Sequence, residues 1–206
     1  MNAWDQALFL WLNLGPAAPH VLVRAATWIS VQGPNGLLAA TLAVALFGRD
    51  PWRIQCWRVL PSMALAALVA TVLRPAFRQP RPFDLHQGTQ WIEHASTPGF
   101  PSAHTSVMMA LAVSLALTPG LRAWARPLPL AFGLAMAWSR VALGVHFPSD
   151  VLAGMVVGAV CALALQRVGH LRGVRQPPLV PSGAGAMPAP EAASAPAPAR
   201  RRAPDA

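Results

Sequence analysis

Five long apolar stretches dominate this sequence, at about residues 25–47, 57–73, 103–121, 127–145 and 151–168. Of its 206 residues, 54% are hydrophobic and 11% are charged, whereas about a quarter of an average soluble domain is charged. Helices are the default for lipid-embedded segments because they satisfy every backbone polar group internally. In the last stretch, "GMVVG" at 154–158 has the small-xxx-small spacing of a helix-packing face. The sequence therefore predicts an all-α, polytopic membrane bundle of five transmembrane helices rather than a soluble helical bundle.

The two ends of the chain differ from this apolar region. Residues 1–24 contain "WDQALFLWLNLG", which favours a short interfacial helix, with Trp4 and Trp11 at headgroup depth, or a weak sixth span. Residues 25–172 form the membrane domain. Residues 173–206 are rich in Pro, Ala and Arg and have no apolar periodicity, which predicts a disordered tail.

The arginines predict an orientation. All 16 basic residues are Arg, and most of them alternate with apolar runs, which favours a role in topology over nucleic-acid binding. If five spans alternate from residue 25, eleven of the 16 share one face with the tail. The positive-inside rule makes that face cytoplasmic. The arginines left on the outer face are Arg24, Arg74, Arg78, Arg81 and Arg140. Apart from Arg24, these arginines flank polar segments. Their position on the outer face is against the positive-inside rule, so it needs another explanation.

Three polar segments lie at the outer ends of the expected spans: "RPAFRQPRP" at 74–82, "PSAH" at 101–104 and "SRVALGVHFPSD" at 139–150. Folding therefore brings them together. Three converging guanidinium groups would repel one another unless they held an anion, and their forks match phosphate oxygens. The segment "PSAH" also precedes an apolar helix, whose first backbone N–H groups favour an anion. We therefore expect a phosphate site at this end of the bundle.

Two histidines supply the chemistry for such a site. His146 and Asp150 are four residues apart, so the carboxylate can hold one imidazole nitrogen and leave the other free. An oriented histidine beside bound phosphate is a nucleophile for phosphoryl transfer. His104, on a different helix, can protonate the leaving oxygen and then activate water. Each residue alone also has a structural interpretation, and it is the joint spacing that favours catalysis.

The three segments resemble the motifs of the type-2 phosphatidic acid phosphatase superfamily of membrane lipid phosphatases, which are K-x6-R-P, P-S-G-H and S-R-x5-H-x3-D. Here they read Arg74-x6-Arg81-Pro82, Pro101-Ser102-Ala103-His104 and Ser139-Arg140-x5-His146-x3-Asp150. The resemblance implies a phosphohistidine on His146, acid catalysis by His104 and no metal or other cofactor. It implies that residues of all three motifs bind phosphate: Arg74, Arg81, Ser102, Ala103, Ser139 and Arg140. Arg74 stands where the family has Lys and Ala103 where it has Gly, and we expect both to leave activity intact.

The loop at 83–100 bears on the substrate. Its flanks, "PRPF" and "HASTPGFPSAH", are similar to bacterial undecaprenyl-diphosphate phosphatases of this superfamily. This implies hydrolysis of undecaprenyl diphosphate to undecaprenyl phosphate, which recycles the cell-wall carrier lipid, at the outer face of the bacterial inner membrane. Glu93 and His94 either contact a second phosphate or headgroup, or are exposed loop residues.

Several other functions use the same motifs. One enzymatic alternative is a phosphatase for phosphatidylglycerophosphate or phosphatidic acid, and another is a lipid A phosphatase or phosphotransferase. Five apolar spans argue against a soluble vanadate haloperoxidase. The presence of His104, His146 and Asp150 argues against a catalytically inactive lipid-binding protein. The expected partners are therefore a lipid-linked phosphate or diphosphate and the bilayer, without nucleic acid, and the sequence leaves the oligomeric state open.

Overall fold

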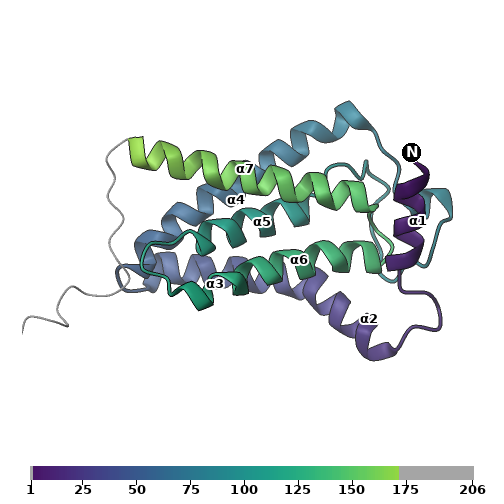
Figure 1. Ribbon diagram of the computed structural model, residues 1–206, viewed down its shortest axis with the longest axis horizontal. Helices are drawn as coiled ribbons and strands as arrows, with labels where there is room; N and C mark the ends of the chain where they lie inside the picture. The colour runs from purple at the N-terminus through teal and green to yellow at the C-terminus, as the bar shows by residue number, and fades with distance from the viewer. Residues whose placement is uncertain (1, 172–206) are drawn as a thin grey trace, which may run out of the picture.

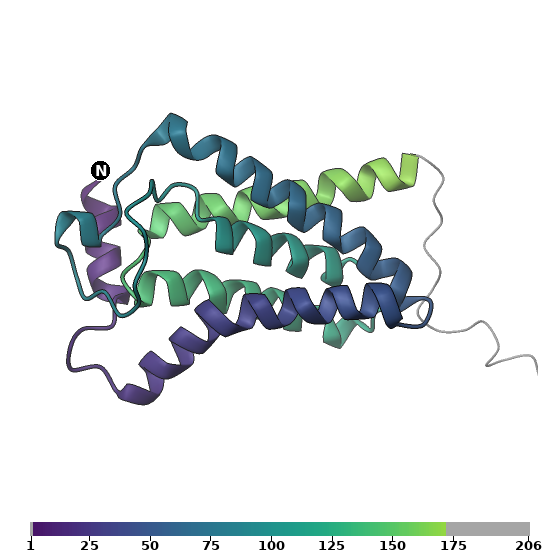
Figure 2. The same ribbon diagram turned by 180° about the vertical axis from the view of Figure 1, so that it is seen from behind.

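In the computed structural model, which describes residues 2–171, the chain folds into an elongated helical bundle (Figures 1 and 2). Its helices are α1 (Ala3–Leu12), α2 (His20–Thr27), α3 (Gly33–Phe47), α4 (Trp52–Phe77), α5 (Ala103–Ala116), α6 (Pro127–Ala142) and α7 (Pro148–Leu171). A π-helical turn (Trp28–Gln32) joins α2 to α3, and short 3-10 turns (Phe83–Leu85 and Ala123–Ala125) lie in loops. The all-α architecture is therefore confirmed, while the tail predicted at 173–206 lies outside the described residues.

Proline sets the start of several helices. Pro127 and Pro148 are the first residues of α6 and α7, and a proline also lies in the first turn of α3. The first turn tolerates proline because its N–H groups have no partner within the helix. Helix α5 ends at Ala116, just before Pro119 and Gly120. The apolar stretch predicted at 103–121 is therefore helical only over its first 14 residues.

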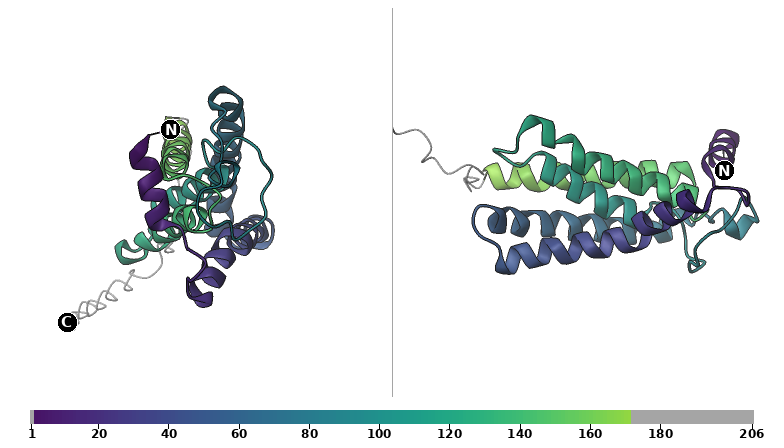
Figure 3. Two further views of the ribbon diagram at one scale, coloured as in Figure 1. Left: turned by 90° about the vertical axis from the view of Figure 1, so that its right-hand side faces the viewer. Right: turned by 90° about the horizontal axis from the view of Figure 1, so that it is seen from below.

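Helix α5 lies in the middle of the bundle and packs against α4, α6 and α7 (Figure 3). Gly154 and Gly158 of α7 lie directly against it, and a Cβ on Gly158 would collide with the backbone of Ser106 and Ala110. This contact confirms the packing role predicted for "GMVVG". The apolar core beside α5 comes from several helices and contains Val59, Met63, Met108, Leu111 and Met136.

Three helical segments are long and apolar enough to cross a membrane: His20–Phe47, Trp52–Phe77 and Pro148–Val168. The first comprises α2, the π-helical turn and α3, and it begins at His20 rather than near residue 25. Helices α5 and α6 are shorter, at 14 and 16 residues, so five crossings stay a prediction. Large apolar side chains are exposed along these helices, as lipid contact requires, and they include Leu38, Leu68, Val156 and Val160.

Helix α1 lies across one end of the bundle, roughly perpendicular to the long helices (Figure 1), and it contacts α6 and α7. Its inner face buries Asp5 and Phe9, whereas Trp4 and Trp11 are 50% and 80% exposed on the outer face. A helix of ten residues is about 15 Å long, half the hydrocarbon thickness of about 30 Å. Its length and direction favour the interfacial helix over a sixth span.

Buried polar side chains gather at the end that α1 covers. There α4 and α6 end and α5 and α7 begin (Figure 2). The three polar segments therefore converge as predicted. Their buried members, each at most 2% exposed, are Arg81, Ser102, Ser139, Arg140, His146 and Asp150.

Candidate active site

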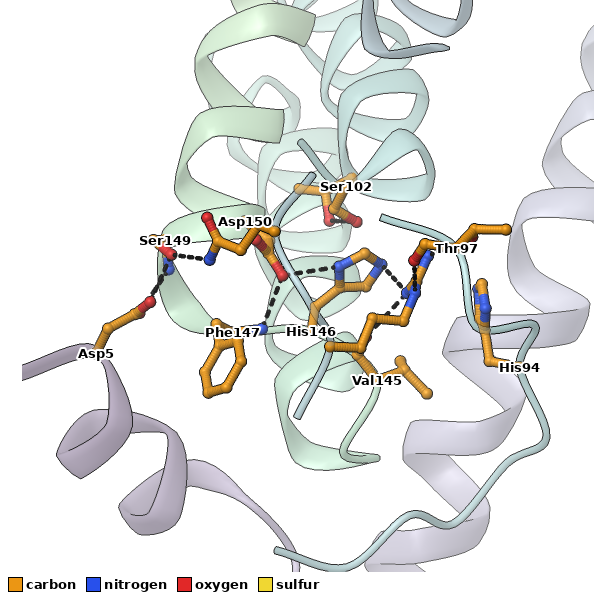
Figure 4. Close-up of polar contacts among 12 residues, drawn as sticks. Asp5, His94, Thr97, Ser102, Val145, His146, Phe147, Ser149 and Asp150 are labelled. Carbon is orange, nitrogen blue, oxygen red and sulfur yellow. Dashed lines mark hydrogen bonds and ion pairs between the residues drawn. The ribbon is translucent and has the colours of Figure 1, made fainter. Parts of the chain in front are cut away.

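A histidine–carboxylate pair lies at the centre of this cluster (Figure 4). His146 occupies the loop between α6 and α7, and Asp150 lies in the first turn of α7. Asp150 Oδ2 is 3.1 Å from His146 Nδ1 and also accepts a hydrogen bond of 3.0 Å from the Phe147 N–H. Because a carboxylate only accepts, the imidazole proton is held on Nδ1. The lone pair is therefore on Nε2; the four-residue spacing predicted that the carboxylate holds one ring nitrogen, and the structure identifies it as Nδ1.

The pKa of His146 supports a neutral imidazole. The side chain is 1% exposed. Burial, followed by the nearby charges of Arg140 and Arg81, holds the pKa of His146 well below its ordinary value. Nε2 is consequently unprotonated at neutral pH.

Arg81 faces this lone pair. Its Nη1 lies 3.1 Å from His146 Nε2 and donates to the Val145 carbonyl at 2.9 Å. Thr97 fixes the other side of the guanidinium, with its carbonyl 2.7 Å from Nε and its hydroxyl 3.3 Å from Nη2. Burial and the neighbouring Arg74 lower the pKa of Arg81 to about 10, which leaves the group charged at neutral pH. A fixed positive charge therefore lies beside the atom that would attack phosphorus.

Two further arginines bring unpaired donors to the cluster. Arg140 in α6 donates from Nη1 to the Ser30 hydroxyl at 2.7 Å, and Ser30 is buried in the π-helical turn. Nε and Nη2 of Arg140 and Nε of Arg74 are buried and have no partner among the described residues. A buried donor without a partner costs free energy, so these N–H groups indicate a site for an anion.

The start of α5 links the second and third motifs. Ser102 precedes the helix, and its N–H donates to the Asp150 carbonyl at 3.0 Å. Its hydroxyl accepts a hydrogen bond of 3.1 Å from Thr105. Ala103 and His104 form the first turn of α5, where backbone N–H groups have no helical partner. Within the described part of the chain, the exposed His104 ring makes no hydrogen bond, and it interacts electrostatically with Arg140 and His146.

The remaining predicted residues differ in their contacts. Ser139 is buried in α6 and donates its hydroxyl hydrogen to the Met136 carbonyl at 2.8 Å. The half-buried His94 ring lies edge-on to His146, with 6.2 Å between centroids, and its Nδ1 is 3.1 Å from the Ala95 carbonyl. Burial lowers the pKa of His94. Glu93 is exposed and makes no hydrogen bond or ion pair with any described residue. The fold therefore brings His94 to the cluster, whereas the described residues give Glu93 no polar contact there.

Three polar residues that the sequence interpretation missed hold the cluster in place. Thr97 fixes Arg81, Ser30 holds Arg140, and Asp5 binds the residue that precedes Asp150. None of them is at a fixed spacing from a motif. The available signal was that Ser30 and Asp5 are polar residues within or beside apolar runs.

Comparison with known proteins identifies the family. A sequence model of the PAP2 superfamily matches residues 55–173, more than half of the chain. A protein of Escherichia coli (strain K12) with the provisional name undecaprenyl-diphosphatase YbjG is 28% identical over 81% of this chain and 83% of its own. Decaprenylphosphoryl-5-phosphoribose phosphatase of Mycolicibacterium smegmatis (strain ATCC 700084 / mc(2)155) is 35% identical over 67% of this chain and 68% of its own.

A solved structure shares the fold. The crystal structure of the first transmembrane PAP2 type phosphatidylglycerolphosphate phosphatase from Bacillus subtilis superposes with a TM-score of 0.66, at 20% identity, over 84% of this chain and 87% of that chain. The matched region of the sequence model contains Arg74, His104, His146 and Asp150. The chain therefore belongs to the PAP2 superfamily and is a multi-pass membrane phosphatase that acts on lipid phosphates.

Proposed function

We propose that this phosphatase works through a phosphohistidine on Nε2 of His146. The observation that carries the proposal is the buried His146–Asp150 hydrogen bond of 3.1 Å. It places the ring proton on Nδ1 and the lone pair on Nε2, and the depressed pKa keeps the ring neutral. As Nε2 bonds to phosphorus, the ring gains positive charge. The Asp150 carboxylate stabilises that charge at Nδ1.

The phosphoryl group is bound by donors that converge on Nε2. We assign Arg74 and Arg140 to its oxygens because their buried N–H groups have no partner in the described structure. The N–H groups that open α5, at Ala103 and His104, add the positive end of a helix. Arg81 Nη1 lies 3.1 Å from Nε2, and when phosphate binds, this N–H donates to a phosphoryl oxygen in place of Nε2 and frees the lone pair to attack.

The two serines of the motifs complete this site in different ways. The Ser102 hydroxyl accepts from Thr105 and keeps its own hydrogen for phosphate. Ser139 takes part only when its hydroxyl leaves the Met136 carbonyl. Removal of Ser102 is therefore expected to raise KM more than removal of Ser139.

The reaction has two steps that share His104. In the first, Nε2 attacks phosphorus, the bond from phosphorus to the leaving oxygen breaks, and His104 gives that oxygen a proton. In the second, His104 takes a proton from water, the hydroxide bonds to phosphorus, and the Nε2–phosphorus bond breaks. Inorganic phosphate leaves, and both histidines return to their starting protonation states. The exposed position of His104 at the start of α5 suits both transfers.

We propose undecaprenyl diphosphate as the substrate, with its terminal phosphate removed during carrier-lipid recycling. Two observations support this choice. The similar protein of E. coli bears an undecaprenyl-diphosphatase name, and His94 lies beside the attacking histidine, where a second phosphate would extend. Other relatives and neighbours are named for decaprenylphosphoryl-phosphoribose and phosphatidylglycerolphosphate. The alternative is therefore a glycerolipid phosphatase that uses the same chemistry with a different headgroup contact.

We also propose that the site faces the outer side of a bacterial inner membrane. The loops that precede α4 and α6 lie at the end opposite the site; they carry Arg49, Arg122 and Arg126, and Arg53 lies in the first turn of α4. The positive-inside rule makes that end cytoplasmic. A cysteine introduced at the exposed Ala95 is then expected to react with a membrane-impermeant maleimide in intact spheroplasts, whereas one at exposed Arg122 reacts only after lysis.

The test of the function is phosphate release by detergent-purified protein, in excess chelator, from undecaprenyl diphosphate and from phosphatidylglycerophosphate. His146→Ala serves as the blank. His20→Ala serves as the matched control because it removes an exposed histidine outside the cluster. We expect the control to retain wild-type activity and His146→Ala to lose it.

Each outcome of that assay has a distinct meaning. Faster release from the prenyl diphosphate supports the carrier-recycling role, and faster release from the glycerolipid replaces it with the alternative. Activity in His146→Ala, or a reversible loss in chelator, contradicts the mechanism. The intermediate itself is detected by alkaline quench of His104→Ala during turnover, because phosphohistidine survives alkali and is lost in acid.

A further inference from the structure

Asp5 is a buried carboxylate in a helix that lies outside the region matched by the family model. It belongs to α1, is 3% exposed, and precedes the matched residues 55–173 by about 50 positions. A carboxylate that is buried without a positively charged partner is uncommon in proteins. Its hydrogen-bond partners therefore indicate why it lies there.

Both oxygens of Asp5 bind Ser149, the second residue of α7 (Figure 4). Oδ1 accepts from the Ser149 N–H at 2.9 Å, and Oδ2 accepts from the Ser149 hydroxyl at 2.6 Å. The Ser149 hydroxyl in turn accepts from Gln79 Nε2 at 3.3 Å. The N–H groups in the first turn of a helix have no partner within it, and negative charge is favoured at that end. Asp5 thus caps α7 from a different helix.

The capped turn is the one that contains Asp150. Asp150 directly follows Ser149, and its carboxylate reaches back to the Phe147 N–H and to His146. The ring of Phe9 also packs edge-on against Phe147, with 5.3 Å between centroids. Helix α1 therefore contacts two of the three residues that directly precede Asp150, Phe147 and Ser149.

We infer that Asp5 is a positioning residue, which fixes the His146–Asp150 pair by anchoring the first turn of α7 to α1. Asp5 does not touch the expected position of phosphate; it acts through Ser149. The inference rests on the proposed role of His146 and Asp150 in catalysis. It assigns a function to the N-terminal helix, which the three motifs do not include.

The test compares kcat and KM of Asp5→Ala, Asp5→Asn and the wild type on whichever of the two lipid phosphates the wild type hydrolyses. We expect kcat of Asp5→Ala to fall by up to about 100-fold, the loss that a misplacement of about 1 Å causes. KM should change less than about twofold because the phosphate donors are intact. Asp5→Asn should retain most of kcat because its amide can still accept from the Ser149 N–H and bond to its hydroxyl.

Two further variants keep the test decisive. Asp50→Asn removes an exposed carboxylate at the other end of the bundle, and it should match the wild type. Ser149→Ala keeps the backbone contact and loses the hydroxyl contact, so it tests the same link if Asp5→Ala does not fold. The Asp5→Ala/Ser149→Ala double variant should lose less kcat than the product of the two single losses, since both act on one contact.

A spectroscopic readout separates this inference from the proposed function. In 15N–1H spectra, assigned with a His146→Gln variant, the protonated Nδ1 of His146 should give a sharp signal in wild type and Asp5→Asn and a broadened one in Asp5→Ala. An unchanged signal together with wild-type kcat in Asp5→Ala would overturn the inference. An equal loss of kcat in Asp5→Asn would also overturn it. If the wild type releases no phosphate, only the proposed function is refuted. The inference about Asp5 can still be tested, because the Nδ1 signal of His146 shows whether Asp5 fixes the ring.

Discussion

Gly99 is the position where one added methyl group should disable the enzyme. A Cβ at this residue would lie 2.9 Å from Oδ2 of Asp150, the oxygen that holds His146. Ordinary contact begins at 3.4 Å. The carboxylate or the loop must therefore move by about 0.5 Å, and the loop is tied by the Gly99 N–H to the Gln79 carbonyl at 2.8 Å.

The expected loss follows from this displacement. The Nδ1–Oδ2 distance is 3.1 Å, near the long end of hydrogen bonds, so a further 0.5 Å or so breaks it. Because about 1 Å of misplacement costs up to about 100-fold, we expect kcat of Gly99→Ala to fall by about tenfold or more. KM should change little, since Arg74 and Arg140 are not displaced.

The assay is steady-state phosphate release with the same lipid used for the wild type. Gly36→Ala is the matched control because a Cβ there meets no atom within 4 Å. Thermal unfolding of both variants shows whether Gly99→Ala remains folded. A folded Gly99→Ala with kcat within twofold of Gly36→Ala would refute the proposed dependence on the position of Asp150.

Three other predictions concern catalysis and packing. His104→Ala should slow turnover by roughly 100-fold or more, and the deficit should shrink with a p-nitrophenyl phosphate leaving group; an equal deficit with both substrates would argue against an acid role. Burial and the nearby arginines hold the pKa of His146 well below its ordinary value, so its neutral form persists as pH falls. Quench-flow rates of phosphohistidine formation from p-nitrophenyl phosphate should therefore change less than about twofold between about pH 7.5 and 6, and a midpoint near the ordinary value of about 6.5 would contradict this. Gly158→Ala should force α7 away from the Ser106 backbone and lower the unfolding temperature. An unchanged temperature would show that α5 and α7 can shift relative to each other without loss of stability.

The sequence was sufficient to predict the all-α architecture and the three polar segments that meet at the site. The apolar runs predicted the positions of the long helices because a helix in contact with lipid needs apolar side chains. The spacing from His146 to Asp150 predicted their hydrogen bond, which forms because the carboxylate reaches back from the first turn of α7 to the loop just before it. The short length of α5 was less predictable, since Leu117 and Leu121 extend the apolar run past the point where the helix ends.

The supporting contacts could not be predicted, for a different physical reason. Arg81 is held by Thr97 and by the Val145 carbonyl, and Arg140 is held by Ser30. Each partner is between 16 and 110 residues away along the chain, so no local period or spacing marks it. Asp5 is a further example, because an acidic residue in the first turn of a short helix is ordinarily a solvated one.

The length of α5 also bears on how far below the bilayer surface the site lies. Fourteen residues span about 21 Å, against about 30 Å of hydrocarbon. If one end of α5 meets one surface of the bilayer, the other end stops several ångströms beneath the opposite surface. The loop that carries Arg81 and His94 would then lie below the headgroups at that end. A lipid phosphate would have to move below its neighbours to reach the site, so that bilayer thickness, and not only headgroup chemistry, would affect which molecules bind.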